Sequence, residues 1–355
     1  MTTDTVGGVW QYSLDLAAAL AKVDGDVVLA TLGPPPSPEQ RSEADAAGVR
    51  LIVTDLPLDW LSDGPAPILA AGEAIAKLAA GEQVDLVHLN TPTLAASGHF
   101  RMPVVAAVHG CVATWWDAAH GGALPADLGW QRVLTSHGLA AADIVVAPSA
   151  SHAEAVMREY GLVRLPVVVH NGRMPLAPPR ATLARRAFTA GRLWDRVKDT
   201  ALLDRVAARL AVPIRAAGAV RGPHGETVEP LHLDLLGQLH GAALGAELAE
   251  RPVFVSAARF EPFGLAVLEA AAAGCPLVLA DIATFRELWD GVALFAPVGD
   301  DAAFQSAIET LLDDQALAER LGDAALVRAR RYTPEATASA MAALYAQLTE
   351  QRVAA

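Results

Sequence analysis

Short runs of valine and isoleucine alternate along the chain with alanine-rich stretches whose apolar residues recur at helical spacing. This alternation is typical of parallel strands joined by crossover helices, so the predicted fold class is α/β. Each predicted strand is continuously apolar, the pattern of a strand buried on both faces. In the first half the predicted strands are residues 27–32, 51–54, 84–89, 104–109, 144–147 and 167–170, and the predicted helices are residues 9–23, 68–80, 133–142 and 151–160.

A proline-rich stretch, residues 174–180, interrupts this pattern and predicts a stiff linker between two halves. The second half is predicted to be another doubly wound unit, with strands at residues 188–190, 214–217, 253–256, 277–280 and 293–295. A final helix is expected from Pro334 to about residue 352, with Thr333 as its N-cap. The predicted domains are therefore 1–174 and 175–332, followed by a C-terminal helical segment, 333–355.

The beginning of the first domain is unusual, because only residues 1–5 precede the Gly7-Gly8 turn. A doubly wound domain normally opens with a complete buried strand. Either the first strand is very short, or the natural start lies upstream of Met1.

Composition narrows the possible functions. The chain has 355 residues, of which 53% are hydrophobic and 19% charged, so it can bury two cores and is not a disordered protein. Its formal net charge of -13 argues against a nucleic-acid partner. Cys111 and Cys275 are far apart and lack metal-ligand spacing, which argues against a disulfide framework or a structural zinc site. With no secretory signal and no apolar run of about 20 residues, we expect a soluble cytoplasmic protein.

Two glutamates, Glu261 and Glu269, stand eight residues apart across a helix start predicted near Phe263. Free amides and the positive dipole end of that helix favour an anion, and the carboxylates can accept hydrogen bonds from vicinal hydroxyls. The pattern therefore fits a diphosphate flanked by a sugar and a ribose. A capping glutamate with an unrelated surface glutamate is the alternative.

Upstream, Gly191-Arg192 and Lys198 follow a short predicted strand. The fork of an arginine and the mobile charge of a lysine suit the clamping of a diphosphate. The alternative is a solvated, charged first turn, because Asp195, Arg196 and Asp199 also lie there.

Two glycine turns are further candidates. Gly7-Gly8 precedes an amphipathic helix and would let backbone amides approach a phosphate, although no GxGxxG or GxxxxGK[ST] pattern is present. Asn171-Gly172 ends the last predicted strand of the first half and fits either a binding loop or a plain turn at the linker.

His109 ends a buried strand, where open parallel sheets bind ligands, and it could donate to a sugar hydroxyl or a phosphate oxygen. A lone histidine there is also compatible with a structural role. Trp115, Trp116 and Asp117 follow, and they fit either a platform for a sugar or other acceptor, or a loop anchored by aromatic packing.

Together these motifs resemble the retaining glycosyltransferases of family 4, of the bacterial type with an EX7E motif, along the whole chain. The motifs are Gly7-Gly8, His109-Gly110, Asn171-Gly172, Gly191-Arg192 with Lys198, and Glu261 with Glu269. The resemblance implies the GT-B fold, in which two Rossmann-like domains face a central cleft and the C-terminal helix crosses back to the N-terminal domain. Against the usual pattern, His170 replaces a proline and Asp199 a glycine or asparagine.

The resemblance also implies roles for the residues of the motifs. Arg192 and Lys198 would hold the donor diphosphate, and Glu269 the ribose. Glu261 and the backbone of Phe263, Gly264 and Leu265 would hold the donor sugar. The Gly7-Gly8 turn, through Gly8, would approach the phosphate, His109 would contact the sugar near the reacting centre, and Asn171 would line the donor site. The donor's α configuration would be retained by same-face attack, with no metal, cofactor or enzymic nucleophile.

The predicted function is therefore transfer of a hexose from a nucleotide diphosphate sugar, with UDP expected before GDP, to a soluble hydroxylated acceptor. Residues 1–174 hold nine Lys/Arg against eighteen Asp/Glu, which disfavours a membrane-bound acceptor. A non-catalytic nucleotide-sugar binding or scaffolding protein of the same fold is the alternative. A bilobal solute-binding protein fits less well, because an export signal is lacking.

Overall fold

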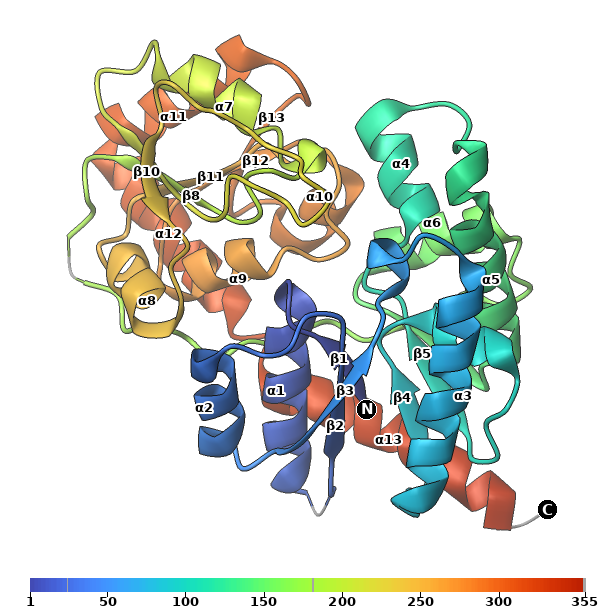
Figure 1. Ribbon diagram of the computed structural model, residues 1–355. Helices are drawn as coiled ribbons and strands as arrows, with labels where there is room; N and C mark the ends of the chain where they lie inside the picture. Colours follow the sequence, from blue (N-terminus) through green and yellow to red (C-terminus); the bar gives the residue numbers. More distant parts are fainter. Residues whose placement is uncertain (24, 181, 354–355) are drawn as a thin grey trace. The chain divides into compact units, whose positions relative to one another are not determined.

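The chain folds into two compact units in a computed structural model that describes residues 1–23, 25–180 and 182–353 (Figure 1). The first unit comprises Met1–Gly172 together with the C-terminal segment that begins at Pro334, and the second comprises Arg173–Thr333. Because the C-terminal segment belongs to the first unit, the chain crosses back to the N-terminal domain at its end.

The first unit contains seven short parallel strands among its described residues. Strands β1 (Thr2–Asp4), β2 (Val28–Leu32) and β3 (Arg50–Leu56) form one sheet, and strands β4 (Val87–Leu89), β5 (Val104–Ala107), β6 (Ile144–Ala147) and β7 (Val167–Val168) form another. Asn90 joins the two sheets, because its backbone N–H donates to Thr2 Oγ1 (3.0 Å) and its Nδ2 donates to the Thr2 carbonyl (2.7 Å). Strands β1 and β4 therefore lie at the adjoining edges of the two sheets.

Helices connect these strands and bury their apolar faces on the sheets. They are α1 (Gly8–Ala21), α2 (Pro38–Ala46), α3 (Pro65–Gly81), α4 (Val112–His120), α5 (Gly129–Ala141) and α6 (Ala150–Tyr160), with the 3-10 turns η1 (Asp59–Leu61), η2 (Pro92–Ser97) and η3 (Ala126–Leu128). The returning helix α13 (Pro334–Val353) packs against α1 (Figure 1). Thr337 Oγ1 donates to the carbonyl of His170 at 2.8 Å, which fixes the start of α13 against the end of the last strand.

The second unit is a six-stranded parallel sheet in the order β10-β9-β8-β11-β12-β13. Its strands are β8 (Ala187–Ala190), β9 (Ile214–Ala217), β10 (Asp234–Gly237), β11 (Val253–Ser256), β12 (Leu277–Ala280) and β13 (Leu294–Ala296). The connecting helices are η4 (Arg196–Lys198), α7 (Thr200–Ala207), α8 (Gly241–Ala249), α9 (Leu265–Ala272), α10 (Ala283–Trp289), α11 (Asp301–Asp313) and α12 (Gln315–Ala329). The strand order reverses between β8 and β11, so these two strands flank the switch point.

The predicted fold class is confirmed, and several predicted strands coincide with the observed ones, including residues 144–147, 214–217, 253–256 and 277–280. The first strand, β1, is short and spans Thr2–Asp4. Three elements were missed: α2, α4 and β10. The expectation that each strand of the first half is buried on both faces is wrong for β3 and β7, which lie at sheet edges and are partly exposed.

Helix α13 begins at Pro334, and the last two residues of the predicted segment, 354 and 355, lie outside the described residues. Over the three described ranges, no helix has both the length and the apolar character that a membrane crossing requires.

The contact between α5 and η2 yields a stability prediction. A Cβ atom added at Gly138 of α5 would lie 1.9 Å from the Pro92 carbonyl oxygen, so Gly138→Ala forces these elements apart. We expect a loss of about 1–3 kcal/mol in the free energy of unfolding, as for other overpacked sites. Gly129→Ala in the same helix is the matched control, because no atom lies within 4 Å of the added Cβ. Thermal melts of equal stability for the two variants would contradict this packing.

Candidate active site

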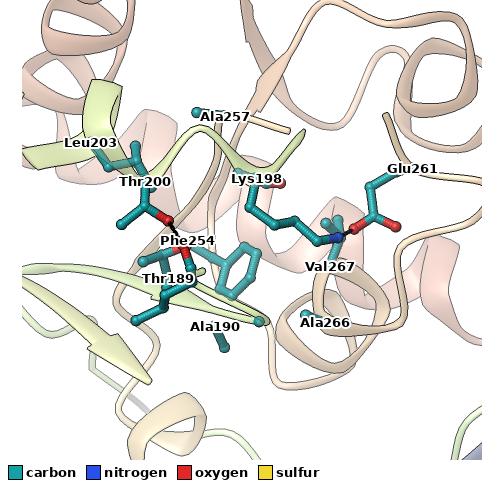
Figure 2. Close-up of a pocket in the computed structure, with 13 residues that line it drawn as sticks. Thr189, Ala190, Lys198, Thr200, Leu203, Phe254, Ala257, Glu261, Ala266 and Val267 are labelled. Atoms are coloured by element: carbon teal, nitrogen blue, oxygen red, sulfur yellow. Dashed lines mark hydrogen bonds and ion pairs between the residues drawn. The ribbon is translucent and has the colours of Figure 1, made fainter. Parts of the chain in front are cut away.

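A pocket in the second unit lies at the carboxyl ends of β8 and β11, the switch point at which open parallel sheets bind ligands (Figure 2). Its lining includes Thr189, Gly191, Lys198, Ser256, Glu261 and Val267. The lining therefore combines loops after two strands with the first turn of α9.

Lys198 and Glu261 form an ion pair inside this pocket, between Nζ and Oε1 (Figure 2). Lys198 ends η4 and Glu261 lies in the loop before α9, and both side chains are largely withdrawn from water. The two loops are also tied through their backbones, because the Arg259 N–H donates to the Val197 carbonyl at 2.8 Å. An ammonium group offers three donors, so Lys198 can bind an anion while Glu261 holds it in place.

Arg192 is held by a buried carboxylate. Its Nη2 donates to Asp195 Oδ2 at 2.8 Å, and its guanidinium carbon lies 5.6 Å from the centroid of the Trp194 ring. Asp195 is only 3% exposed, and its Oδ1 accepts from the backbone N–H of Val197. The solvated-turn alternative is therefore wrong for Asp195, which positions Arg192 beside the pocket.

The start of α9 depends on Gly264. Its φ of 92° lies in the left-handed region that favours glycine, and a Cβ there would lie 3.0 Å from a ring carbon of Phe285. The helix therefore begins at Leu265, two residues later than predicted, with the buried Phe263 packed edge-to-face on Tyr332. Ala266 and Val267 line the pocket, so the positive end of the helix dipole lies at the pocket wall.

Glu269 lies one turn further along α9, where Arg173 Nε donates to its Oε1 at 2.8 Å. The two side chains are 11% and 12% exposed. Glu269 is therefore not a surface glutamate, and Glu261 is not a helix cap, because the N-cap residue of α9 is Gly264. Sequence reasoning missed Arg173. Its place directly after the Asn171-Gly172 turn was the available signal.

The Gly7-Gly8 turn lies in the first unit, between β1 and α1. The backbone N–H groups of Val6 and Gly7 both donate to Asp4 Oδ1, at 2.9 and 3.2 Å. The Gly7 amide is therefore occupied, whereas Gly8 is exposed at the N-terminus of α1. Of the two predicted glycines, Gly8 is the one placed to approach an anion.

Asn171 lies in the same unit, after β7. It is buried, and among the described residues its Oδ1 has no hydrogen-bond partner. The role of Asn171 in a binding loop stays a prediction.

His109 follows β5 in the first unit and is partly buried. Its Nε2 lies 2.9 Å from Asn90 Oδ1, and its ring packs edge-to-face on Tyr12 at 4.4 Å between centroids. Burial lowers the pKa of His109 to about 3, so the imidazole is neutral at physiological pH. Sequence reasoning missed Asn90, although His88-Leu89-Asn90 stands directly at the end of β4.

Trp115, Trp116 and Asp117 belong to α4, so the loop alternative for them is wrong. Trp116 stacks on His120, with ring centroids 4.0 Å apart, and Trp115 lies 6.3 Å from Trp116. Asp117 is exposed. The two rings are partly exposed on one helix, which is compatible with a platform.

The described part of the chain contains no group of three or more His, Cys, Asp and Glu side chains placed to hold a metal ion. The charged residues that line the pocket are Lys198 and Glu261, and Arg192 follows the lining residue Gly191 in the chain. Such a set suits a phosphorylated ligand held by Arg and Lys.

Comparisons with known proteins agree with this arrangement. A family model described as Glycosyltransferase Family 4 matches residues 6–173, and one described as Glycosyl transferases group 1 matches residues 184–314. The chain is 28% identical to glycogen synthase of Mycobacterium tuberculosis (strain CDC 1551 / Oshkosh), over 91% of this chain and 86% of that protein. It is 36% identical to phosphatidyl-myo-inositol mannosyltransferase of Mycobacterium leprae, but over only 36% of this chain and 34% of that protein.

Solved structures share the fold at low sequence identity. Sucrose-phosphate synthase from Thermosynechococcus elongatus superposes with a TM-score of 0.78 at 19% identity, covering 99% of both chains. HepE of Anabaena, in complex with UDP-glucose, gives a TM-score of 0.75 at 17% identity, covering 98% of this chain and 99% of that chain.

The fold is therefore the GT-B fold, built from two Rossmann-like domains. Its two domains match glycosyltransferase models of the family 4 and group 1 types, and the chain is a transferase enzyme.

The pairing of Arg173 with Glu269 makes a prediction that is independent of substrate. Arg173→Ala removes the guanidinium from a carboxylate that is largely withdrawn from water, so we expect a loss of about 1–3 kcal/mol in stability. Adding Glu269→Gln should recover part of this loss, because the neutral amide tolerates burial better. Arg196→Ala is the control, since Arg196 is exposed in the same unit. Strictly additive effects in a double-mutant cycle of melts would show that the two residues are uncoupled.

Proposed function

We propose that this enzyme transfers a hexose from a UDP-sugar, with a GDP-sugar as the next candidate, to a hydroxylated small molecule or glycan, with retention of the donor's α configuration. The observation that carries the proposal is the Lys198–Glu261 pair beside Arg192 at the switch point of the second unit. HepE, whose structure contains UDP-glucose, supports a nucleotide sugar as the donor.

Each charged residue then has a role. Arg192 and Lys198 neutralise the diphosphate as negative charge develops on the leaving group, and the N-terminus of α9 adds its dipole. Glu261 and the backbone of residues 263–265 hold the donor sugar. Glu269, oriented by Arg173, accepts hydrogen bonds from the ribose hydroxyls.

The reaction breaks the bond between the anomeric carbon and the diphosphate oxygen and forms a bond from that carbon to the acceptor oxygen. The acceptor attacks on the face that the leaving group departs from, and its proton passes to a leaving phosphate oxygen. This step needs no enzymic nucleophile. It also needs no divalent metal, because Arg192, Lys198 and the helix dipole stabilise the charge that a metal stabilises elsewhere.

The first unit supplies the other residues of the proposed site. Gly8 approaches the phosphate, Asn171 lines the donor site, and His109 contacts the sugar near the anomeric centre. Trp115, Trp116 and Asp117 are candidates for the acceptor. Cys111 and Cys275 are both free thiols, which suits action in the cytoplasm.

A thermal-shift panel identifies the donor. UDP, GDP and ADP, each with its glucose or mannose conjugate, are compared with and without EDTA. We expect UDP compounds to raise the melting temperature equally in both conditions, because a ligand bound only by the folded state stabilises it. A shift that EDTA abolishes would contradict metal independence. Binding without turnover in the presence of candidate acceptors would favour the non-catalytic alternative.

Substitutions separate the two charged positions kinetically. Lys198→Ala should lower kcat about 100-fold or more, because Lys198 acts on charge that develops in the transition state. Glu269→Ala should mainly raise KM for the donor, because ribose contacts are alike in the ground and transition states. Lys22→Ala is the control for Lys198, since Lys22 is an exposed lysine paired with Glu335 in the first unit. Unchanged turnover in Lys198→Ala would refute the diphosphate clamp.

A further inference from the structure

The side-chain amide of Asn90 uses all of its hydrogen-bonding capacity inside the first unit. Its Nδ2 donates to the Thr2 carbonyl at 2.7 Å and to Ser13 Oγ at 3.0 Å. Its Oδ1 lies 3.0 Å from His88 Nε2 and 2.9 Å from His109 Nε2. An amide has two N–H donors and two carbonyl lone pairs, so these four contacts complete it.

The orientation of this amide is determined by Thr2. A backbone carbonyl only accepts, so the group facing it must be the NH2 of Asn90, and the carbonyl oxygen must face the two histidines. Both histidines therefore donate from Nε2. His109 is then a neutral imidazole whose Nδ1 carries a lone pair, and among the described residues Nδ1 has no hydrogen-bond partner.

His88 connects this amide to the C-terminal helix. Because its Nε2 donates to Asn90, its Nδ1 accepts, and Tyr345 of α13 donates its hydroxyl there at 2.6 Å. Burial raises the pKa of Tyr345 well above its ordinary value, so the hydroxyl keeps its proton. His88 is buried, and burial lowers its pKa to about 3, with the Met1 amino group and His109 as further causes.

We propose that Asn90 is a positioning residue that fixes His109 as the Nε2–H tautomer. The ring then presents Nδ1 as an acceptor to a hydroxyl of the donor sugar. Tyr345 of the returning helix holds this network in place through its hydrogen bond to His88. This rests on the proposed function of His109, and it changes the direction of the expected bond. His109 accepts from a hydroxyl and does not donate to a phosphate.

The groups facing His109 allow this neutral state. Tyr12 from α1 packs on the ring, with its pKa raised by burial, so it is uncharged. His88 and Asn90 come from the segment that contains β4, and His152 from α6 acts to lower the pKa of His109. His152 is itself buried, with its pKa lowered to about 4. No carboxylate is among these groups, so nothing in the described surroundings favours an imidazolium.

The wild-type protein tests the tautomer directly. Nitrogen-15 histidine labelling reports the protonation of each ring nitrogen, and His109→Gln and His88→Gln assign two of the ten histidines. At neutral pH we expect a protonated Nε2 and an unprotonated Nδ1 for both residues. A protonated Nδ1 on His109, or an imidazolium, would overturn the proposal without any measurement of activity.

Two variants test the network kinetically. Tyr345→Phe removes only the hydroxyl, and we expect kcat to fall about three- to tenfold with little change in KM, because His109 loses its alignment. Tyr160→Phe is the matched control, because Tyr160 lies on α6 and is not among the hydrogen-bond partners of Asn90 or His88 in the described part of the chain. Equal kcat in the two variants would overturn the role of Tyr345.

Asn90→Asp tests the charge. A carboxylate favours an imidazolium, so the pKa of His109 rises and Nδ1 becomes protonated as the pH falls. We expect turnover of this variant to drop about tenfold between about pH 8 and pH 6, where the wild type shows no such limb. A wild-type-like pH profile in folded Asn90→Asp would overturn the proposal. If the tautomer is as proposed but His109→Ala leaves kcat unchanged, the assignment of His109 in the proposed function is at fault.

Discussion

A parallel sheet brings the carboxyl ends of all its strands to one edge, and the candidate chemistry of this protein depends on that constraint. In the second unit the loops after β8 and β11 meet at the switch point and bring Lys198 to Glu261 from 63 residues away. In the first unit the ends of β4 and β5 bring Asn90 to His109. Each pair depends on its two strands being neighbours in the sheet, β8 with β11 and β4 with β5.

The second unit holds its charges in pairs. Lys198 is paired with Glu261, Arg192 with Asp195, and Glu269 with Arg173. A lone charge withdrawn from water is expensive, so each partner makes the burial of the other tolerable. The same pairing fixes side chains that would otherwise lose rotamer freedom on binding. In the proposed function, this pairing prepares the pocket for the diphosphate before it binds, which is the condition for electrostatic catalysis.

The fold class could be predicted from the sequence, because continuous apolar strands and helical spacing are local signals. The Glu261/Glu269 pair could also be predicted, because its two members flank one helix start. Lys198 could be predicted because it follows Gly191-Arg192 closely in the chain. The roles of Arg173 and Asn90 could not be predicted from the sequence, because their partners lie far away in the chain. Arg173 bonds Glu269, and Asn90 bonds Thr2 and His109. Strand β10 was missed since its exposed residues, Asp234–Gly237, lack the apolar pattern of a central strand.

In the proposed function, the two units bind different parts of the donor with different chemistry. Phosphate charge requires cations, and the second unit supplies them at a rim where water still reaches Arg192. A hydroxyl close to a reacting carbon requires a neutral partner, because an imidazolium there would disfavour positive charge that develops on the sugar. The first unit secures neutrality by burial and by the fully hydrogen-bonded amide of Asn90. Tyr345 on α13 extends this network, because its hydroxyl donates to His88 Nδ1. If the network acts as proposed, the returning helix contributes to the chemistry of the first unit as well as to its packing.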